Sequence, residues 1–100
     1  MFVHNVFFWL KNAASEEDKS KLLEGLQSLK PIEVIRTIHI GVPASTDRPV
    51  IERGYDLSLL LIFDTPEDQE TYQVHPVHKA FVERCKELWS KVVIYDAVDA

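Results

Sequence analysis

The sequence contains a single cysteine among its 100 residues, so no disulfide can form within the chain. Basic residues are few: 11 lysines and arginines stand against 16 aspartates and glutamates, which gives a net charge of −5. No basic run occurs, which argues against nucleic acid and anionic membranes as partners. No apolar run approaches the roughly 20 residues that span a membrane, and the first ten residues lack the pattern of a signal peptide. These features predict one cytoplasmic domain over residues 1–100.

The apolar residues follow two periods, which predict an alternation of strands and helices. Residues 2–10 are apolar on both alternating sets, and residues 33–42 and 55–63 are rich in aliphatic and β-branched side chains. Leu22, Leu23, Leu26 and Leu29 recur at helical spacing, and Pro31 is expected to stop that helix. Phe81, Val82, Cys85, Leu88 and Trp89 form a second helical stripe, which precedes a last strand at 92–97. Residues 43–54 are polar and predict a long loop.

Two segments have the residues that begin helices. In Ser15-Glu16-Glu17-Asp18 and Thr65-Pro66-Glu67-Asp68, a hydroxyl residue is followed three positions later by a carboxylate. The hydroxyl oxygen caps a free backbone N–H, and the acidic side chains interact favourably with the positive end of the helix. The sequence therefore predicts helix starts at both segments.

The second helix should be interrupted at Val74-His75. A residue before proline is pushed out of the α region, and Pro76 suits the first position of a new helix. The side chain of His75 is expected to cap this new helix. Extending the stripe of Phe81 backward by one turn reaches His78, which should therefore lie on the buried face near free backbone N–H groups. That setting disfavours a charged imidazole, so we expect His78 to be neutral near pH 7.

The order strand, helix, strand, strand, helix, strand predicts an α+β fold of the ferredoxin-like type, with an antiparallel four-stranded sheet and both helices on one face. The strands carry more apolar side chains than one face can hold. Leaving several hundred Å² of apolar sheet in water costs on the order of 10 kcal/mol. The bare face is therefore expected to meet a second copy, which gives a homodimeric α+β barrel.

Several residues together resemble the stress-responsive A/B barrel (Dabb) domain family. They are His4, Arg53-Gly54-Tyr55-Asp56, Tyr72-x-x-His75-Pro76-x-His78-x-x-Phe81 and Val93-Ile94-Tyr95-Asp96. The resemblance implies a homodimeric α+β barrel. Most members of this family have no assigned activity. Within this family, the chain resembles the olivetolic acid cyclase-like proteins of plants, which work without a cofactor. This resemblance implies that His78 and Tyr72 are catalytic and that His4 lies in the pocket. The chain departs from the plant enzyme in its first helix, where Leu22, Leu23 and Leu26 replace aromatic residues that shape the plant enzyme's pocket.

Two functions from different classes remain open. In the first, the chain is an enzyme without a cofactor that acts on a small, partly apolar carbonyl compound, with His78 as general base and Tyr72 as hydrogen-bond donor. Its ligand pocket would be lined by His4, Leu22, Leu26, Leu59 and Trp89. In the second, the same residues only shape the helix break, and the chain is a non-catalytic stress-related dimer that binds a small ligand.

Other polar residues have structural interpretations. His75 and His78 lie three residues apart and lack a convincing third metal ligand, although His4 or Asp56 could approach them in space, and no metal site is predicted. His39 is expected to be an interface or hydrogen-bonded strand histidine. Arg48 and Arg53 could hold an anion but are better explained as solvated loop charges. No glycine-rich phosphate loop or CxxC motif occurs.

Overall fold

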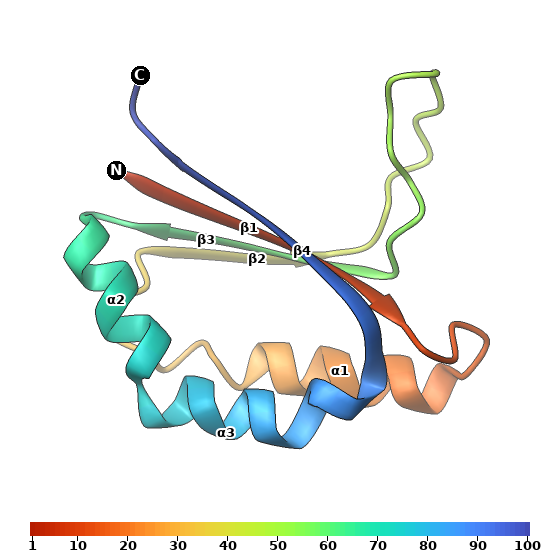
Figure 1. Cartoon of the computed structure of the whole chain (residues 1–100), viewed down its shortest axis with the longest axis horizontal. Coiled ribbons are helices and arrows are strands. Elements are labelled where there is room, and N and C mark those ends of the chain that lie inside the picture. The colour runs from red at the N-terminus through yellow and green to blue at the C-terminus, as the bar shows by residue number, and fades with distance from the viewer.

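The computed structural model covers residues 1–100 and has the predicted order of elements (Figure 1). The elements are β1 (Phe2–Leu10), α1 (Glu16–Gln27), β2 (Thr37–Gly41), β3 (Leu57–Phe63), α2 (Pro66–Val74), α3 (Pro76–Cys85), a short 3₁₀ turn (Lys86–Leu88) and β4 (Trp89–Val98). No helix has both the length and the apolar character needed to cross a membrane.

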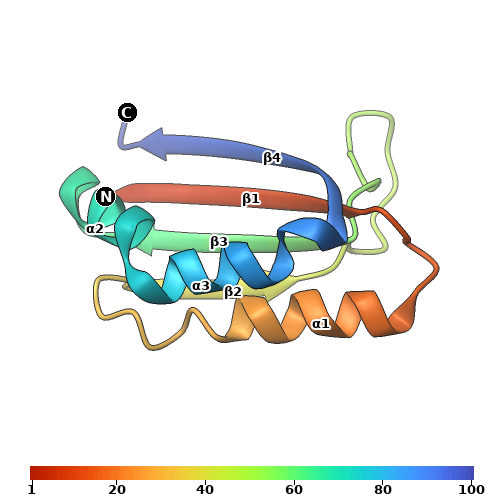
Figure 2. The same cartoon turned by 60° about the horizontal axis from the view of Figure 1, so that its bottom comes forward.

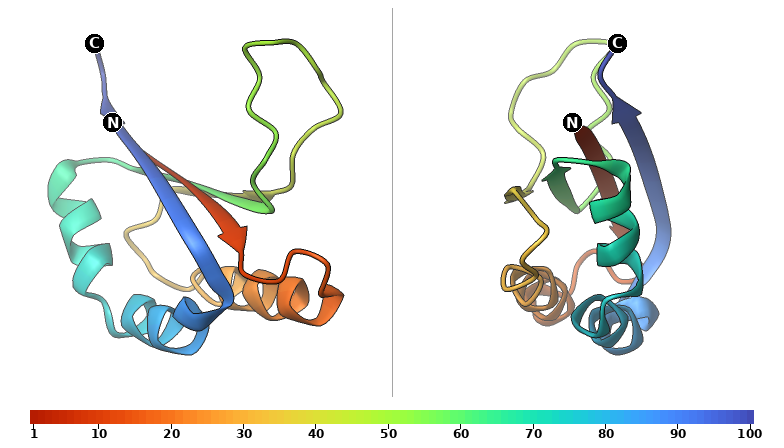
Figure 3. Two further views of the ribbon diagram at one scale, coloured as in Figure 1. Left: turned by 45° about the vertical axis from the view of Figure 1, so that its right-hand side comes forward. Right: turned by 90° about the vertical axis from the view of Figure 1, so that its left-hand side faces the viewer.

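The four strands form one antiparallel sheet in the order β2-β3-β1-β4. All helices lie on one face of this sheet (Figure 1). α1 covers the β2 side, and α3 lies nearer to the β4 side (Figures 2 and 3). This confirms the ferredoxin-like α+β fold.

The hydrophobic core lies between the sheet and the helices. Alternate residues of β1 and β3 are buried, because side chains along a strand point to opposite faces. The fourteen buried apolar residues of the core are Val6, Phe8, Leu10, Leu22, Leu26, Leu29, Ile32, Leu57, Leu59, Leu61, Phe63, Tyr72, Phe81 and Cys85. His4 is the one buried polar residue, and it continues the inward-facing row of β1.

The predicted helix starts and the predicted break are confirmed. Ser15 accepts a hydrogen bond from the backbone N–H of Asp18, and Thr65 accepts one from Asp68. His75 has an extended backbone (φ −64°, ψ 137°), and it separates α2 from α3. Its Nδ1 accepts a hydrogen bond from the N–H of Val77 at 3.1 Å, so His75 caps α3 as predicted.

Several predicted boundaries are wrong, and each error has a tertiary cause. β2 begins at Thr37 rather than at residue 33, because the chain first makes a turn that buries Ile32 in the core. α1 ends at Gln27, before Leu29 and Pro31. β3 begins two residues later than predicted, at Leu57.

The largest difference concerns Trp89, which the helical spacing placed on the second helix. α3 ends at Cys85, and Trp89 is the first residue of β4, where it pairs with Leu10. Its ring packs against Phe8 and Phe81, with centroids 5.2 Å and 6.0 Å apart. Burial against two aromatic rings thus outweighs the local helical pattern.

The opposite face of the sheet, which we call the open face, has no helix over it (Figure 1). Its apolar side chains come from the positions that alternate with the buried ones: Val3, Phe7, Trp9, Leu60, Ile62, Val93 and Tyr95. The loop of residues 43–54 also rises on this side of the sheet (Figures 1 and 3). The open face is therefore apolar, with an irregular loop standing at one end.

Candidate functional site

A cavity of about 160 Å³ lies between the sheet and helices α2 and α3. Nine of its twelve lining residues are hydrophobic, so the polar ones stand out. The lining consists of His4, Val6, Phe8, Leu59, Tyr72, Gln73, His78, Phe81, Val82, Trp89, Val92 and Ile94. A few polar groups in an otherwise apolar concave site are typical of a small-molecule pocket.

The break between α2 and α3 determines how His78 is held. In a continuous helix the N–H of Val77 would donate to the C=O of Gln73, four residues earlier. Here that N–H donates to His75, which leaves the Gln73 carbonyl without its usual partner. His78 Nδ1–H donates to this carbonyl at 3.1 Å instead. The Tyr-x-x-His-Pro-x-His motif therefore positions His78 through the helix end that the proline creates.

This hydrogen bond sets the tautomer of His78. A carbonyl oxygen can only accept, so the hydrogen must be on Nδ1, and the neutral ring has its lone pair on Nε2. Burial lowers the pKa of His78, and nearby His4 lowers it further, although the hydrogen bond to Gln73 opposes both effects. His78 is therefore neutral near pH 7, and its Nε2 can accept a proton.

Tyr72 lies between the two histidines that line the cavity. Its ring centroid is 4.6 Å from that of His78 and 6.0 Å from that of His4. Only 1% of its surface is exposed, and burial raises its pKa well above the usual value, so the hydroxyl stays protonated. The hydroxyl has no hydrogen-bond partner within the chain, yet no fully buried side-chain polar atom lacks a partner. The hydroxyl oxygen is therefore not fully buried, and since Tyr72 lines the cavity, a ligand there can accept its hydrogen bond.

Asp96 does not line the cavity but holds His4, which does, and sequence reasoning missed this role. It stands opposite His4 in the register of β1 and β4, and its carboxylate is hydrogen-bonded to His4 Nδ1. A carboxylate can only accept a hydrogen bond, so Nδ1 of His4 carries the hydrogen. The available signal was weak: Asp96 shares the alternating phase of Val92 and Ile94, but only the strand pairing brings it to His4.

The structure brings most of the predicted site residues together. His4, Leu59, Tyr72, His78 and Trp89 all line the cavity, Trp89 from β4 instead of from a helix. Leu22 and Leu26 do not line it. Both are fully buried in the core, because α1 covers the β2 side of the sheet (Figure 2). The cavity lies toward β4, since Val92 and Ile94 line it.

The histidines of the motif do not converge with other metal-binding side chains. No group of three histidine, cysteine, aspartate or glutamate residues lies close enough together to hold a metal ion. His75 is engaged as a helix cap, and Asp56 accepts a hydrogen bond from the N–H of Leu10 at 2.8 Å.

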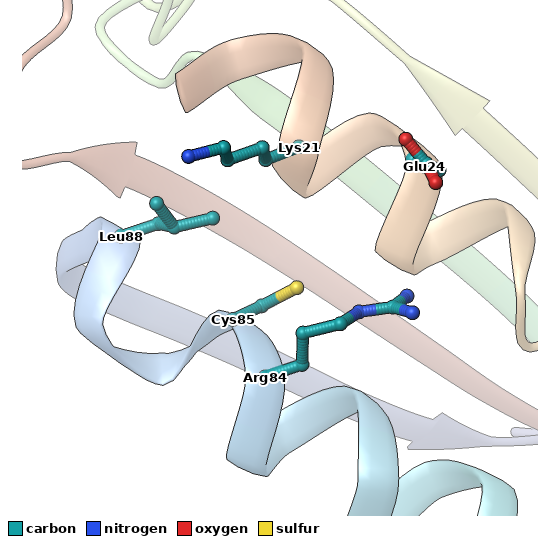
Figure 4. A pocket seen from close by; sticks show the side chains of 5 residues that line it. All are labelled: Lys21, Glu24, Arg84, Cys85 and Leu88. Carbon is teal, nitrogen blue, oxygen red and sulfur yellow. The ribbon is translucent and has the colours of Figure 1, made fainter. Parts of the chain in front are cut away.

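A larger hollow of about 380 Å³ lies between α1 and α3, away from these residues (Figure 4). It is lined by Lys21, Glu24, Arg84, Cys85 and Leu88. Its two cations already have partners within the chain: Lys21 pairs with Glu17 at 3.3 Å, and Arg84 donates to Ser28 at 3.4 Å. The smaller cavity, where a base and a donor face the same space, is the candidate site.

The antiparallel sheet with the helices on one face defines a ferredoxin-like α+β protein, with a cavity lined by His4, Tyr72 and His78. Residues 2–99 match the model of the Stress Responsive A/B Barrel Domain, and the chain belongs to this family, known as Dabb. No curated protein matches the chain.

Solved structures show the same fold. A Dabb family protein from Mesorhizobium loti has a TM-score of 0.81 at 24% identity, over 99% of this chain and 96% of that one. A hydroxynitrile lyase from Passiflora edulis has a TM-score of 0.79 at 17% identity, over 99% and 93%. A dimeric ferredoxin-like protein of unknown function from Thermobifida fusca has a TM-score of 0.77 at 18% identity, over 96% and 88%. The fold therefore occurs in an enzyme and in proteins of unknown function.

Proposed function

We propose that this protein is a cofactor-independent enzyme that removes a proton from a small, largely apolar carbonyl compound. His78 acts as the general base, and Tyr72 donates a hydrogen bond to the oxyanion that forms. The observation that carries this proposal is the hydrogen bond from His78 Nδ1 to Gln73, because it leaves Nε2 as a proton acceptor beside the free hydroxyl of Tyr72.

The reaction step follows from these two groups. Nε2 of His78 takes the proton from the carbon next to the carbonyl. The electron pair of that C–H bond forms a double bond to the carbonyl carbon, and the π pair of the C=O bond moves onto the oxygen. The resulting enolate oxygen accepts a hydrogen bond from the Tyr72 hydroxyl, whose raised pKa keeps it a donor. His78 then returns the proton to the carbon, or the enolate carbon attacks a second carbonyl group and the alkoxide that forms takes the proton from His78.

The cavity limits the substrate. Its volume of about 160 Å³ is close to the roughly 150 Å³ of a cavity that holds benzene in another protein. No lysine or arginine lines it, so it offers no fixed cation to an anionic ligand. A neutral compound about the size of a benzene ring with a short carbonyl substituent fits these limits. The hydroxynitrile lyase of Passiflora edulis supports the idea that this fold can serve as an enzyme.

Hydrogen–deuterium exchange tests the proton step without knowledge of the full reaction. The protein is incubated in D₂O with acetophenone derivatives and phenylacetaldehyde, and NMR follows loss of the proton next to the carbonyl. We expect exchange above the buffer rate, abolition in His78→Ala and no change in the control Gln27→Ala, which alters an exposed residue of α1 outside the cavity and the open face. Equal exchange in wild type and His78→Ala would refute the proposal.

We also propose that the protein is a homodimer whose protomers meet through the open face. No helix covers the apolar residues of that face, most of which are only half-buried, and ferredoxin-like proteins of similar structure from Thermobifida fusca, Bacteroides fragilis and Jannaschia are dimeric. Analytical ultracentrifugation at micromolar concentration should give twice the chain mass of 11.5 kDa. Trp9→Glu, which places a charge on that face, should dissociate or unfold the protein. A folded wild-type monomer would contradict this proposal.

The alternative is a dimer that binds a small ligand without turnover. It is favoured by one observation: both histidines of the motif satisfy backbone groups at the helix break, His75 on Val77 and His78 on Gln73. In that case His78→Ala should lower stability about as much as His75→Ala. The same carbonyl compounds should then raise the melting temperature of the wild type, while no exchange with D₂O occurs.

A further inference from the structure

The loop of residues 43–54 and the open face together form a concave surface. A hollow of about 240 Å³ has its floor on the sheet, made by Phe7, Trp9, Val93 and Tyr95, and it is also lined by Glu52 of the loop and by Tyr55, which directly follows the loop. The backbone of the loop packs directly on this floor, since a Cβ added at Gly54 would lie 3.5 Å from Trp9 Nε1. The loop is therefore one wall of a surface whose floor is the open face.

The floor of this hollow is aromatic. The ring of Phe7 meets the edges of Tyr55 and Tyr95, at centroid distances of 5.0 Å and 6.3 Å. Lys91 lies over the ring of Trp9, with Nζ 4.5 Å from the centroid. Aromatic side chains with a polar rim are characteristic of the centre of a protein–protein interface.

The loop is organised by its own hydrogen bonds and charges but buries little of itself. The N–H of Ile51 donates to the carbonyl of Arg48 at 2.9 Å, and Arg53 pairs with Asp47 at 3.5 Å. Glu52 accepts from the N–H of Gly54 at 2.7 Å. Yet Val50 is 87% exposed, more than any other large hydrophobic residue of the chain. The loop thus presents an apolar side chain that nothing in the protomer covers.

The area of the open face shows why the loop matters. At about 16 Å² per strand residue, the four strands present a flat area of roughly 500 Å². A standard protein interface buries about 800 Å² on each partner. The loop borders the same face and rises away from the helices, so any second sheet packed about 10 Å above that face must lie beside it (Figures 1 and 3).

We infer that the loop of residues 43–54 is a clasp that contacts the second protomer and stabilises the dimer, with Val50 in the contact. This inference rests on the proposed dimer through the open face. In a two-fold symmetric pair the contact occurs twice, since each loop meets the other protomer. Each loop therefore adds contact area to the interface at the end of the sheet where it joins β2 to β3.

The test compares two substitutions that are alike in chemistry. Val50→Asp places a charge in the clasp, and Val74→Asp places the same charge on α2, on the helix side of the sheet, where valine is 63% exposed. Sedimentation equilibrium gives the dissociation constant of each dimer. We expect Val50→Asp to raise this constant about tenfold or more, which is the loss of about 1.4 kcal/mol at an interface contact, and Val74→Asp to leave it unchanged.

The outcomes separate the clasp from the dimer itself. If the wild type is dimeric and both variants have the same dissociation constant as the wild type, the clasp is refuted and the proposed dimer stands. If the wild type is a folded monomer, the proposed dimer and the clasp are both refuted. Circular dichroism of Val50→Asp checks that the fold is retained, which the exposure of this residue leads us to expect.

Discussion

Replacing Gly25 by alanine tests how tightly α1 and α3 pack, and so how firmly the helix that carries His78 is held. Gly25 is buried in the middle of α1, where glycine costs about 1 kcal/mol relative to alanine. On helix propensity alone, Gly25→Ala should therefore stabilise the protein. The contact with α3 opposes this gain. A Cβ at residue 25 would lie 2.5 Å from Cys85 Sγ and 3.0 Å from Phe81 Cδ1.

The size of the two effects decides the sign. Overpacking a close-packed core costs about 1–3 kcal/mol, and the Cys85 side chain that must move is itself buried. We expect Gly25→Ala to lower the free energy of unfolding by roughly 1 kcal/mol, the difference between the steric cost and the gain in helix propensity. Most of the steric cost should come from the contact with Cys85 Sγ, because this is the atom nearest to the added Cβ.

Urea unfolding at one fixed protein concentration measures this change, because the stability of a dimer depends on concentration. The control is a double-mutant cycle with Cys85→Ala, which removes the Sγ atom. Gly25→Ala should be less harmful in the Cys85→Ala background by about 1 kcal/mol, since the two residues are in direct contact. Stabilisation by the full propensity gain in the wild-type background would refute the reasoning, as would strict additivity in the cycle.

Three further predictions concern the site. NMR titration of His78 should give a midpoint below the ordinary pKa of about 6.5, because burial disfavours its charged form. The unfolded chain then binds more protons than the folded one as pH falls below about 6.5, so stability should decrease there, and His78→Ala should lessen that decrease. Tyr72→Phe should reduce the D₂O exchange rate by roughly 10²–10³ with little loss of stability, because the hydroxyl has no partner in the chain; an unchanged rate would remove Tyr72 from the mechanism. His75→Ala should cost about 1 kcal/mol of stability by removing a helix cap, measured by urea unfolding against Gln27→Ala, which alters an exposed residue of α1; equal stability of the two variants would contradict the capping role.

The amino-acid sequence determined the features that depend on neighbouring residues. The caps at Ser15 and Thr65 and the break before Pro76 follow from the backbone preferences of three or four consecutive residues. The buried row that starts at His4 follows from the alternation of side chains along β1. These local rules were sufficient for the order of elements, and hence for the ferredoxin-like fold.

The placement of His78 and Tyr72 was also accessible to sequence reasoning, because both belong to one short motif around the break. The sequence predicted that both side chains point toward His4, and in the structure all three residues line one cavity. Whether they catalyse a reaction stays a prediction, and so do the cytoplasmic location and the extent of the domain over residues 1–100. None of these follows from the arrangement of the fold alone.

Only the tertiary structure decided which side chains meet across the sheet and the helix layer. Asp96 reaches His4 through the register of β1 with β4, and Leu22 and Leu26 are kept from the cavity by the position of α1 over β2. Trp89 has a helical spacing in the sequence, yet packing against Phe8 and Phe81 places it in β4. These outcomes depend on contacts between residues that are distant in the chain, and packing energy there exceeds the small local preference that a sequence pattern can express.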